Sequence, residues 1–517
     1  MFILNQIKKF IKSNKKIIFK KNTSKVALAI DRGLHDHIIR NSIVGAVINK
    51  IFNINIEVIT DHNKKSWQTK VYKSFGIEKF YRPISINNII KNPLIFIKCF
   101  FKTIFSIIEI EKKKLIWFVK DFKIKDIHIG EIIYDEYIRH GKKYLNPKVL
   151  DSRFVSILFK SILRVYLIND YFDKKQVKFV IVSSKNSINN SSISLRLALK
   201  KKIKVIFNAH NFIKILKNYN EALVNPRVIT NKDINHLKKS KIKINTINKN
   251  YFMRLKGYTK GDFAGSQDIK SAYFKKKIIN KKQILKMYSG NFNNIVLFAS
   301  HLFADAGHLA GKHFLFIDYY NQMIETINFI KKLNRKDTLW VFKPHPSSYR
   351  YGEDGILEKV INKLNTPNMV IYPKNVSLKS FLLSCDLLIT GRGNIGIEAA
   401  GLGTNVVVAG NNYYQKLGLV FEPGTKSEYF KYIKKIKFNK LNLNQINKSR
   451  KVMYIIDNIH PKIIKRGKII PEKNPADYYI TTKQYFERLN KNFQNQSFVR
   501  DKYFLHLENI LKKNLLN

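Results

Sequence analysis

The alternation of strand-like and helix-like segments between residues 294 and 409 constrains the fold more than any other feature. Short apolar runs typical of buried strands occur at Asn294–Ser300, Thr338–Phe342, Met369–Tyr372, Asp386–Thr390 and Asn405–Ala409. Segments with helical periodicity separate them, from about Ile317 to Leu333, Glu353 to Leu364, Leu378 to Ser384, and from Ile395 onward. Because parallel strands need a crossover helix between them, this alternation predicts a parallel, doubly wound sheet.

A second, less regular alternation occupies the N-terminal half. A strand is expected at Lys25–Asp31, a helix from about His35 to Phe52, and a second strand at Ile54–Thr60. Two further strands, Val177–Ser184 and Lys204–His210, flank another helical segment. No GxGxxG fingerprint accompanies them. The sequence therefore predicts an α/β protein with two Rossmann-like domains and a long helical, basic insertion between about residues 85 and 170.

The length of 517 residues exceeds what one hydrophobic core usually serves, so at least two domains are expected. We place the junction near the end of a Lys-, Asn- and Ile-rich stretch that precedes the regular alternation. The expected parts are a basic amphipathic helix, an N-terminal α/β domain, a C-terminal Rossmann-like domain, and a helical tail that packs back on the N-terminal domain. Their boundaries are 1–22, 23–286, 287–450 and 451–517.

The chain is strongly basic, with 95 lysines and arginines, 36 acidic residues and a net charge of +59. Such a charge is typical of proteins that bind nucleic acid, anionic membranes or anionic substrates. Lysine, asparagine and isoleucine crowd every region, which favours general compositional drift over a dedicated polyanion surface. Since no nucleic-acid-binding signature is present, no specific nucleic-acid partner is expected.

The location of the protein is indicated by its cysteines and its N-terminus. Cys99 and Cys385 are far apart and lack metal-ligand spacing, which favours a reducing compartment and the cytoplasm. Residues 1–22 combine helical apolar spacing with interspersed lysines but have no signal-peptide apolar region. Two interpretations stay open: a helix lying on anionic lipid at the inner membrane face, or a helix that caps the first domain. A second apolar concentration, Pro93–Ile110, is broken by lysines and is too short to span a bilayer.

The stretch Trp340–Ser348, WVFKPHPSS, ends a predicted strand on a histidine between two prolines. Each proline fixes its own φ and restricts the preceding residue, so Lys343 and His345 are presented in a nearly set direction. Ligands of doubly wound sheets bind beyond the carboxyl ends of the strands. We therefore expect Lys343 and His345 at a ligand site, although a turn histidine satisfied by backbone is the alternative.

A glycine-containing loop follows another predicted strand. Small residues and free N–H groups at a helix start favour phosphate, and an arginine adds a charge-assisted contact. Glu398, about one turn into the helix, could reach a ribose diol. The alternative is a tight turn whose glycines serve packing, with Glu398 as a dipole partner. The candidate phosphate-binding residues are Thr390, Gly391, Arg392, Gly393 and Asn394.

Candidates for a catalytic base follow the first strand of each half. Asp305, within Ser300–His308, is one; Asp36 and His35, within Asp31–His37, are the others. Helix capping and surface histidines are the plainer interpretation of both stretches. No carboxylate spacing supports a metal site. Tyr413 could stack on a base or a sugar, or simply pack at a domain interface.

These residues resemble a known family, the capsule-polysaccharide-type glycosyltransferases of GT-B fold. The family includes the bacterial Kdo transferases and is more distantly similar to CDP-glycerol glycerophosphotransferases. The resemblance covers roughly residues 125 to 435. It rests on KPHP (Lys343–Pro346), TGRGNIGIEAAGLG (Thr390–Gly403), Ala409–Phe430 and, less distinctively, GEIIYDEYIR (Gly130–Arg139). The chain departs from the family pattern at Gly391–Asn394, which leaves the nucleotide preference open.

The resemblance implies a fold in which two Rossmann-like domains face a cleft, with the sugar nucleotide on the C-terminal domain and the acceptor on the N-terminal one. It implies an inverting, metal-independent glycosyltransferase that builds capsular or other surface polysaccharide. The donor would be a CMP-, UDP- or GDP-linked sugar, the acceptor a saccharide or lipid-linked saccharide, and no cofactor would be bound permanently. Protonated His345 would stabilise the departing phosphate. Alternatives are a polyol-phosphate transferase, a sugar-nucleotide 2-epimerase, and a non-enzymatic polyanion-binding protein.

Overall fold

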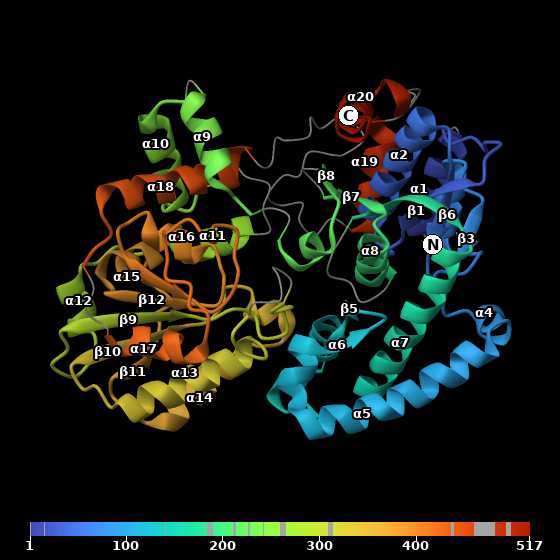
Figure 1. The fold of residues 1–517 in the computed structure, drawn as a ribbon. Coiled ribbons are helices and arrows are strands. Elements are labelled where there is room, and N and C mark those ends of the chain that lie inside the picture. The colour runs from blue at the N-terminus through green and yellow to red at the C-terminus, as the bar shows by residue number, and fades with distance from the viewer. Residues whose placement is uncertain are drawn as a thin grey trace. The chain divides into compact units, whose positions relative to one another are not determined.

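The structure of the protein is a computed structural model in which the chain forms two compact units, each described by itself (Figure 1). Unit 1 comprises Met1–Tyr137, Lys148–Leu223 and Pro461–Asn517, and unit 2 comprises Ile138–Pro147 and Val224–His460. The described residues are 2–14, 16–139, 141–183, 190–209, 213–225, 228–240, 242–258, 265–308, 314–435, 439–459, 481–492 and 498–516.

Unit 1 is built on a six-stranded sheet with the order β3-β2-β1-β6-β7-β8. All neighbouring strands are parallel except β7 and β8, which pair antiparallel. The predicted N-terminal α/β sheet is thus confirmed, with an antiparallel edge that the sequence did not indicate. The strands are β1 (Lys25–Ile30), β2 (Asn55–Ile59), β3 (Lys79–Tyr81), β6 (Gln176–Val182), β7 (Lys204–Asn208) and β8 (Ile213–Leu216).

The central helix of unit 1, α2 (His35–Phe52), is buried along most of its length because α3 and α20 also pack against it. The insertion consists mainly of two long helices, α5 (Pro93–Asp121) and α7 (Ser152–Asp173), which pack against each other. The other elements are α3 (Trp67–Ser74), α4 (Ile86–Ile90), β4 (Lys123–Ile124), β5 (Ile127–His128), α6 (Gly130–Ile138) and α8 (Asn190–Lys200).

The two ends of the chain pack together on unit 1. Helix α1 (Phe2–Ser13) contacts α3 and α19 (Thr482–Asn492), and α20 (Lys502–Leu515) lies against α2. Ile7 and Phe10 of α1 are buried at 2% and 1% exposure in the core of the unit. Of the two interpretations of the N-terminal helix, the structure favours the cap on the first domain, since Ile7 and Phe10 are already covered, although Leu4 stays 51% exposed.

Unit 2 contains the regular alternation predicted from the sequence. Its five-stranded sheet has the order β11-β10-β9-β12-β13, and every neighbouring pair is parallel. The doubly wound prediction is therefore confirmed, with strand ends within one or two residues of those expected. The strands are β9 (Asn294–Ala299), β10 (Thr338–Lys343), β11 (Met369–Ile371), β12 (Leu387–Thr390) and β13 (Asn405–Val408).

Helices cover the sheet of unit 2, and α14 begins at Ile356 rather than at the expected Glu353. The crossover helices are α13 (Tyr319–Leu333), α14 (Ile356–Leu364), α15 (Leu378–Ser384) and α16 (Ile395–Ala400). Further helices are α9 (Asn231–Lys239), α10 (Ile244–Arg254), α11 (Gly265–Tyr273), α12 (Lys281–Lys286), α17 (Lys426–Lys435) and α18 (Leu443–Tyr454).

The expected junction near residue 286 is wrong, because the chain passes from unit 1 to unit 2 between Leu223 and Val224. The lysine-rich helices α9 to α12 belong to unit 2. Their few apolar side chains, including Ile234, Ile247 and Ile284, are buried in the same core as the strands β9 and β10. Burial of these isolated isoleucines assigns the segment to unit 2 despite its weak periodicity.

Within the described part of the chain, no helix is long and apolar enough to cross a membrane. Both cysteines, Cys99 and Cys385, are buried free thiols.

Candidate active site

Three strands of unit 2 end side by side at the point where the strand order reverses. Strand β9 pairs with β10 on one side and with β12 on the other, so Ala299 is in register with both Lys343 and Thr390. This is the switch point at which doubly wound sheets bind ligands. The polar residues that follow these strands are therefore held at one edge.

Four side chains beyond these strand ends form a contiguous group, here called the strand-end cluster: His301, His345, Arg392 and Tyr319. The rings of His301 and His345 lie with their centroids 5.6 Å apart. His301 stacks on Tyr319 at 4.1 Å with an interplanar angle of 12°, and the Arg392 guanidinium lies 5.8 Å from the same tyrosine ring. The loops after β9, β10 and β12 each contribute to this group.

Backbone hydrogen bonds orient both histidines. The N–H of Leu302 donates to Nδ1 of His301 at 3.0 Å, and the N–H of Ser347 donates to Nδ1 of His345 at 3.1 Å. An Nδ1 that accepts a hydrogen bond leaves the proton of a neutral ring on Nε2. Each ring therefore offers Nε2–H as a donor.

Both histidines are neutral at physiological pH. Burial, with the nearby His301 and Lys343, lowers the pKa of His345 well below its usual value, although Asp305 opposes this shift. Burial and the charge of Arg392 lower the pKa of His301 to about 3. The expectation of a cationic His345 is thus not supported, because removal of the ring from water disfavours its charged form.

Positive charge at this edge comes from Lys343 and Arg392. Lys343 is buried at the end of β10; its Nζ donates to the carbonyl of Pro344 at 3.2 Å and lies 5.6 Å from the ring of Tyr372. Burial and the neighbouring Lys276 lower the pKa of Lys343 to about 8. The ammonium is still mostly protonated at neutral pH, so it can attract an anion.

One long-range contact and one turn hydrogen bond hold the Pro-His-Pro turn in place. The hydroxyl of Ser347 donates to the carboxylate of Asp268 in α11, and the N–H of Ser348 donates to the carbonyl of His345 at 3.1 Å. Sequence reasoning missed Ser347 and Asp268, which lie 79 positions apart and share no local motif. The direction of His345 is thus set by these contacts as well as by the two prolines.

The loop after β9 is held by two carboxylates. Asp305 lies 3.7 Å from Nδ1 of His301 and accepts the N–H of Ala306 at 2.9 Å. The buried Glu353 accepts the N–H groups of Phe303 and Ala304 at 2.9 and 2.6 Å. Burial raises the pKa of Glu353 to about 7. Glu353 was expected only to begin a helix, so its role in positioning this loop was also missed.

The glycines of the loop after β12 serve different purposes. A Cβ at Gly391 would lie 2.7 Å from the ring of Tyr319, and one at Gly396 would collide with the hydroxyl of Tyr414. Only Gly393 of these three has room, with no atom closer than 3.6 Å. Packing therefore explains Gly391 and Gly396, as the alternative interpretation held, while Gly393 leaves its backbone approachable.

The remaining residues of this loop border the same edge. Arg392 donates from Nη2 to the carbonyl of Ala306 at 2.7 Å and so bridges to the loop after β9. Thr390 is buried at the strand end, and Oδ1 of Asn394 is buried with no hydrogen-bond partner among the described residues. A buried amide oxygen in that state is available to a bound donor group.

Glu398, the predicted ribose contact, is engaged inside unit 2. Its carboxylate is paired with Arg254, whose Nε donates at 2.8 Å, and it accepts the hydroxyl of Tyr273. Arg254 also donates to Asp457 at 2.8 Å. A ribose diol would have to replace one of these donors. Tyr413 is half-buried against the core of unit 2, and its carbonyl accepts the N–H of Ile229 at 2.7 Å.

The two base candidates of unit 1 are held by neighbouring residues of that unit. Asp36 pairs with Arg40 at 3.1 Å and lies 3.8 Å from Nε2 of His37. His35 is hydrogen-bonded to the Thr482 hydroxyl at 3.2 Å, and its ring lies 4.5 Å from that of Tyr485. His35 thus helps to attach α19 to unit 1.

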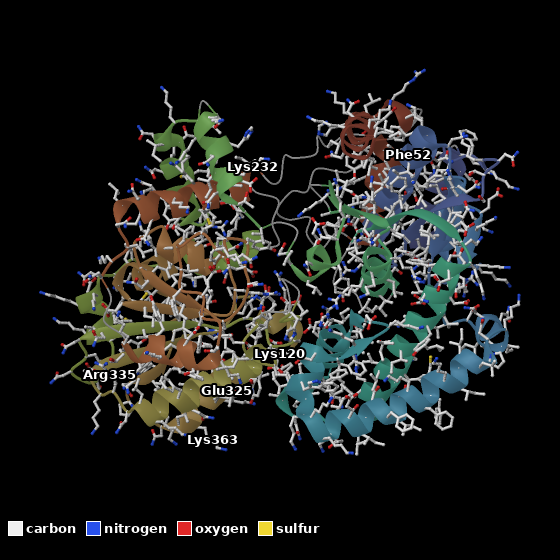
Figure 2. The ribbon with its side chains drawn as sticks, in the orientation of Figure 1. Phe52, Lys120, Lys232, Glu325, Arg335 and Lys363 are labelled. Carbon is white, nitrogen blue, oxygen red and sulfur yellow. The ribbon has the colours of Figure 1, made fainter. Side chains whose placement is uncertain are left out.

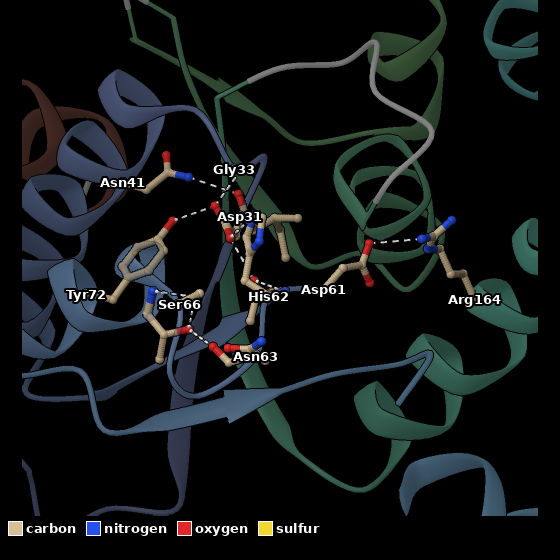
Figure 3. Close-up of polar contacts among 12 residues, drawn as sticks. Asp31, Gly33, Asn41, Asp61, His62, Asn63, Ser66, Tyr72 and Arg164 are labelled. Atoms are coloured by element: carbon tan, nitrogen blue, oxygen red, sulfur yellow. Dashed lines mark hydrogen bonds and ion pairs between the residues drawn. The ribbon is translucent and has the colours of Figure 1, made fainter. Parts of the chain in front are cut away.

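The neighbouring Asp31 has a structural role (Figure 3). Its carboxylate accepts the N–H of Gly33 at 2.8 Å and the hydroxyl of Thr60 at 2.7 Å. Burial raises its pKa, although those donors and His62 oppose the shift. Asp31 therefore ties the end of β1 to the loop after β2.

The structure thus brings Lys343, His345, Asp305 and Arg392 together in unit 2, whereas Asp36 and His35 belong to unit 1. Across the described ranges, no group of three or more His, Cys, Asp or Glu side chains could hold a metal ion.

A comparison with known families finds a match to the C-terminal part of the chain. Residues 207–457 match the family model described as "Capsule polysaccharide biosynthesis protein". The matched segment contains the whole sheet of unit 2, the KPHP turn and the glycine-containing loop. The resemblance drawn from these motifs is therefore confirmed over this segment. Among curated proteins, none matches the sequence.

Several solved structures are similar to parts of the chain. The UDP-GlcNAc 2-epimerase of Methanocaldococcus jannaschii is 12% identical, with 84% of this chain and 99% of that chain covered at a TM-score of 0.27. The UDP-GlcNAc 2-epimerase of Neisseria meningitidis is 12% identical, with 91% and 100% covered at 0.21. KpsC of Thermosulfurimonas dismutans, a beta Kdo 2,4 transferase, is 14% identical, with 53% and 79% covered at 0.28. At these TM-scores the fold class rests on the two sheets themselves.

Proposed function

We propose that this protein is a glycosyltransferase that uses a nucleotide-activated sugar to build capsular or other surface polysaccharide. The observation that carries the proposal is the convergence of Lys343, His345 and Arg392 at the switch point of unit 2. The match of residues 207–457 to a capsule polysaccharide biosynthesis family supports the same function.

The donor phosphates would bind at the strand-end cluster. Lys343 and Arg392 supply positive charge, and the uncrowded backbone at Gly393 allows a phosphate oxygen to approach. The buried amide of Asn394 adds a polar group to the same loop, beside Thr390 and Gly391. Glu398 and Tyr413 remain candidates for the ribose and the base. CMP-, UDP- and GDP-linked sugars all fit this chemistry.

The transfer step follows from the protonation states. His345, held as a neutral Nε2–H donor, would hydrogen-bond the phosphate oxygen on which negative charge grows as the sugar leaves. Lys343 and Arg392 would stabilise that charge electrostatically. A base would remove the acceptor hydroxyl proton, with Asp305, Asp36 or His35 as candidates. We propose an inverting reaction without a metal ion, in which these side chains stabilise the leaving phosphate.

The acceptor would be a saccharide or a lipid-linked saccharide, and unit 1 would bind it. We place the protein in the cytoplasm, where sugar nucleotides are available, with peripheral attachment to the inner membrane face.

The test is a thermal-shift panel of CMP, CDP, UDP, GDP and their sugar conjugates. A ligand that binds only the folded state stabilises it by about 2.7 kcal/mol at a hundredfold excess over Kd. One nucleotide class should stabilise the wild type and the control His236→Ala, which alters an exposed histidine of α9, but stabilise His345→Ala less. The proposed site would be refuted if no nucleotide stabilised the wild type, or if the nucleotide stabilised His345→Ala as much as the wild type.

Product analysis separates the related enzyme classes. Incubation with the donor sugar nucleotide alone should yield no epimer, whereas a sugar-nucleotide 2-epimerase needs no acceptor. A polyol-phosphate transferase would instead consume a CDP-linked polyol and release CMP.

A further inference from the structure

Helix α5 in unit 1 carries its large apolar side chains on the outside. Leu94 is 79% exposed, Phe105 63% and Phe101 53%. At 100° per residue the exposed apolar side chains between Leu94 and Ile108 fall within a stripe about 140° wide along one side of the helix. We call this stripe the outer α5 face; it consists of Leu94, Ile97, Phe100, Phe101, Ile104, Phe105 and Ile108.

The opposite side of α5 faces the protein and mixes small, polar and apolar residues: Cys99, Thr103, Ser106 and Ile110 are buried, and the ring of Phe96 lies 5.4 Å from that of Phe159. The hydroxyls of Thr103 and Ser106 donate to the carbonyls four residues earlier, at 2.8 and 2.6 Å. A helix on the surface of a globular protein normally has its apolar stripe toward the core. Packing against α7 therefore accounts for the inner side of α5, but it does not account for the large apolar side chains that α5 exposes on its outer side.

Basic residues border the outer α5 face. Between Ile86 and Lys120 the chain contains seven lysines and two acidic residues. Lys98 and Lys102 lie along one edge of the apolar stripe, where Nζ of Lys98 is 5.5 Å from the centre of the Tyr166 ring, and Lys91 precedes the helix. The neighbouring α4 adds two exposed isoleucines, Ile86 and Ile90, to the apolar surface.

We propose that the outer α5 face is a docking surface for an anionic lipid bilayer, with the helix lying in the interface. From Leu94 to Ile108 the stripe extends about 21 Å along the helix. An apolar stripe of Phe, Ile and Leu bordered by lysines is the pattern of interfacial helices, whose apolar side enters the acyl boundary while lysines contact anionic headgroups. Figure 2 shows side chains projecting from the outer side of α5.

The combination of apolar and basic residues favours an anionic bilayer over a second copy of the chain or nucleic acid. A second copy of the chain would bring like-charged lysines together across the contact, which disfavours self-association. Nucleic acid would pair with the lysines but would leave the phenylalanines and isoleucines in water. The helix lies on the bilayer and does not cross it, because Lys98 and Lys102 interrupt the stretch and Lys114, at φ 71°, breaks the helical backbone.

The surface differs from the membrane contact expected from the sequence, which was the N-terminal helix α1. It also stands apart from the proposed nucleotide site, since α5 belongs to unit 1 and the strand-end cluster to unit 2. Membrane binding without any nucleotide therefore tests it independently of the proposed function.

The experiment is co-sedimentation of the full chain with vesicles of phosphatidylcholine alone or with about one-third phosphatidylglycerol, without nucleotide. The wild type should partition to the anionic vesicles at least roughly tenfold more strongly than to the neutral ones, because lysines contact anionic headgroups. The double variant Phe101→Glu/Phe105→Glu should lose at least roughly tenfold of that partitioning, because it places charge in the apolar boundary. The control Ile278→Glu/Leu443→Glu changes two similarly exposed apolar residues of unit 2, at 61% and 69% exposure, and should bind as the wild type does.

A second variant, Lys98→Glu/Lys102→Glu, leaves the apolar stripe intact and should weaken binding to anionic vesicles only. Because the altered side chains are exposed or half-buried, the melting temperature of each variant should match the wild type. Equal partitioning to neutral and anionic vesicles, or unchanged binding of both α5 variants, would overturn the proposal. So would a wild-type dimer that binds no vesicles and is dissociated by the phenylalanine substitutions.

Discussion

The carboxyl-terminal edges of the two sheets carry different polar residues in similar topological positions. In unit 1, the first strand is followed by Asp31, whose buried carboxylate is used by Gly33 and Thr60. In unit 2, the first strand is followed by His301, next to His345 and Arg392. Charged side chains join loops at both edges, but only the edge of unit 2 also brings Lys343 and Arg392 next to two neutral histidines. This difference supports the proposal that the anion binds to unit 2.

The largest effect is expected from Arg254→Ala. Arg254 is the shared partner of the buried carboxylates Glu398 and Asp457, so its removal leaves two uncompensated charges. Breaking such a buried pair costs about 3 to 5 kcal/mol. The surface pair of Arg335 and Asp337 provides the control, since Arg335→Ala should cost less than about 1 kcal/mol. Denaturant unfolding measures both; equal losses would contradict the structural role of Glu398.

His345→Ala should lower kcat by about a hundredfold, or about 2.7 kcal/mol, through loss of a preorganised donor at the leaving phosphate. His236→Ala, on the exposed side of α9, should leave kcat unchanged. Initial rates of sugar transfer with saturating donor measure the effect. A tenfold or smaller change in kcat with a large rise in KM would instead assign His345 to ground-state binding.

Asp31→Asn should cost about 1 to 3 kcal/mol of folding stability. The asparagine places an NH2 group where one carboxylate oxygen accepted a hydrogen bond, so one donor loses its acceptor. Asp61→Asn alters the partly buried pair with Arg164 shown in Figure 3; because the asparagine keeps an oxygen that can accept from Arg164, it should cost less than Asp31→Asn. Neither variant should change nucleotide affinity. A changed nucleotide Kd in Asp31→Asn would contradict the proposal that only the edge of unit 2 binds the nucleotide.

The smallest effect concerns pH. The pKa of Lys343 is lowered to about 8, so the free protein loses this cation as pH rises through that value. Nucleotide affinity should fall above pH 8, by up to about tenfold per pH unit for a contact that requires the ammonium. The free energy of unfolding should change in the opposite direction. Lys343 has a higher pKa in the unfolded chain than in the folded protein, so its contribution to folding stability increases as pH rises from about 8 toward 10.5.

Lys343→Arg provides the matched control, because a guanidinium stays protonated throughout this range. Its nucleotide affinity should be nearly independent of pH between 7 and 9, whatever its absolute value. If the nucleotide affinity of the wild type were equally independent of pH, Lys343 would not contact the anion.

The fold could be predicted where local signals were strong. Strands such as Asn294–Ala299 are short apolar runs between helical segments, and their order follows from the rules for parallel sheets. Lys343 and His345 could be placed at the carboxyl-terminal edge of the sheet because they end one of these strands. The junction could not be placed, since Ile234 and Ile284 are isolated apolar residues in lysine-rich helices whose partners are distant in sequence.

The site itself was less predictable, because tertiary contacts decide it. The sequence around Glu353 does not indicate that its carboxylate accepts hydrogen bonds from the loop after β9. Likewise, the sequence around Arg254 does not indicate that it forms an ion pair with Glu398. The charge state of His345 depends on its burial beside His301 and Lys343, which only the packed structure reveals.

The most direct test of the central claim is isothermal titration calorimetry of the stabilising nucleotide against two variants, one from each edge. Lys343→Ala/Arg392→Ala removes both cations of unit 2, and Asp36→Asn alters the polar edge of unit 1. Affinity should fall at least roughly a hundredfold in the double variant, since each charge-assisted contact contributes about 1.5 to 3 kcal/mol, and stay unchanged in Asp36→Asn. Unchanged affinity in the double variant would contradict an anion site at the strand ends of unit 2.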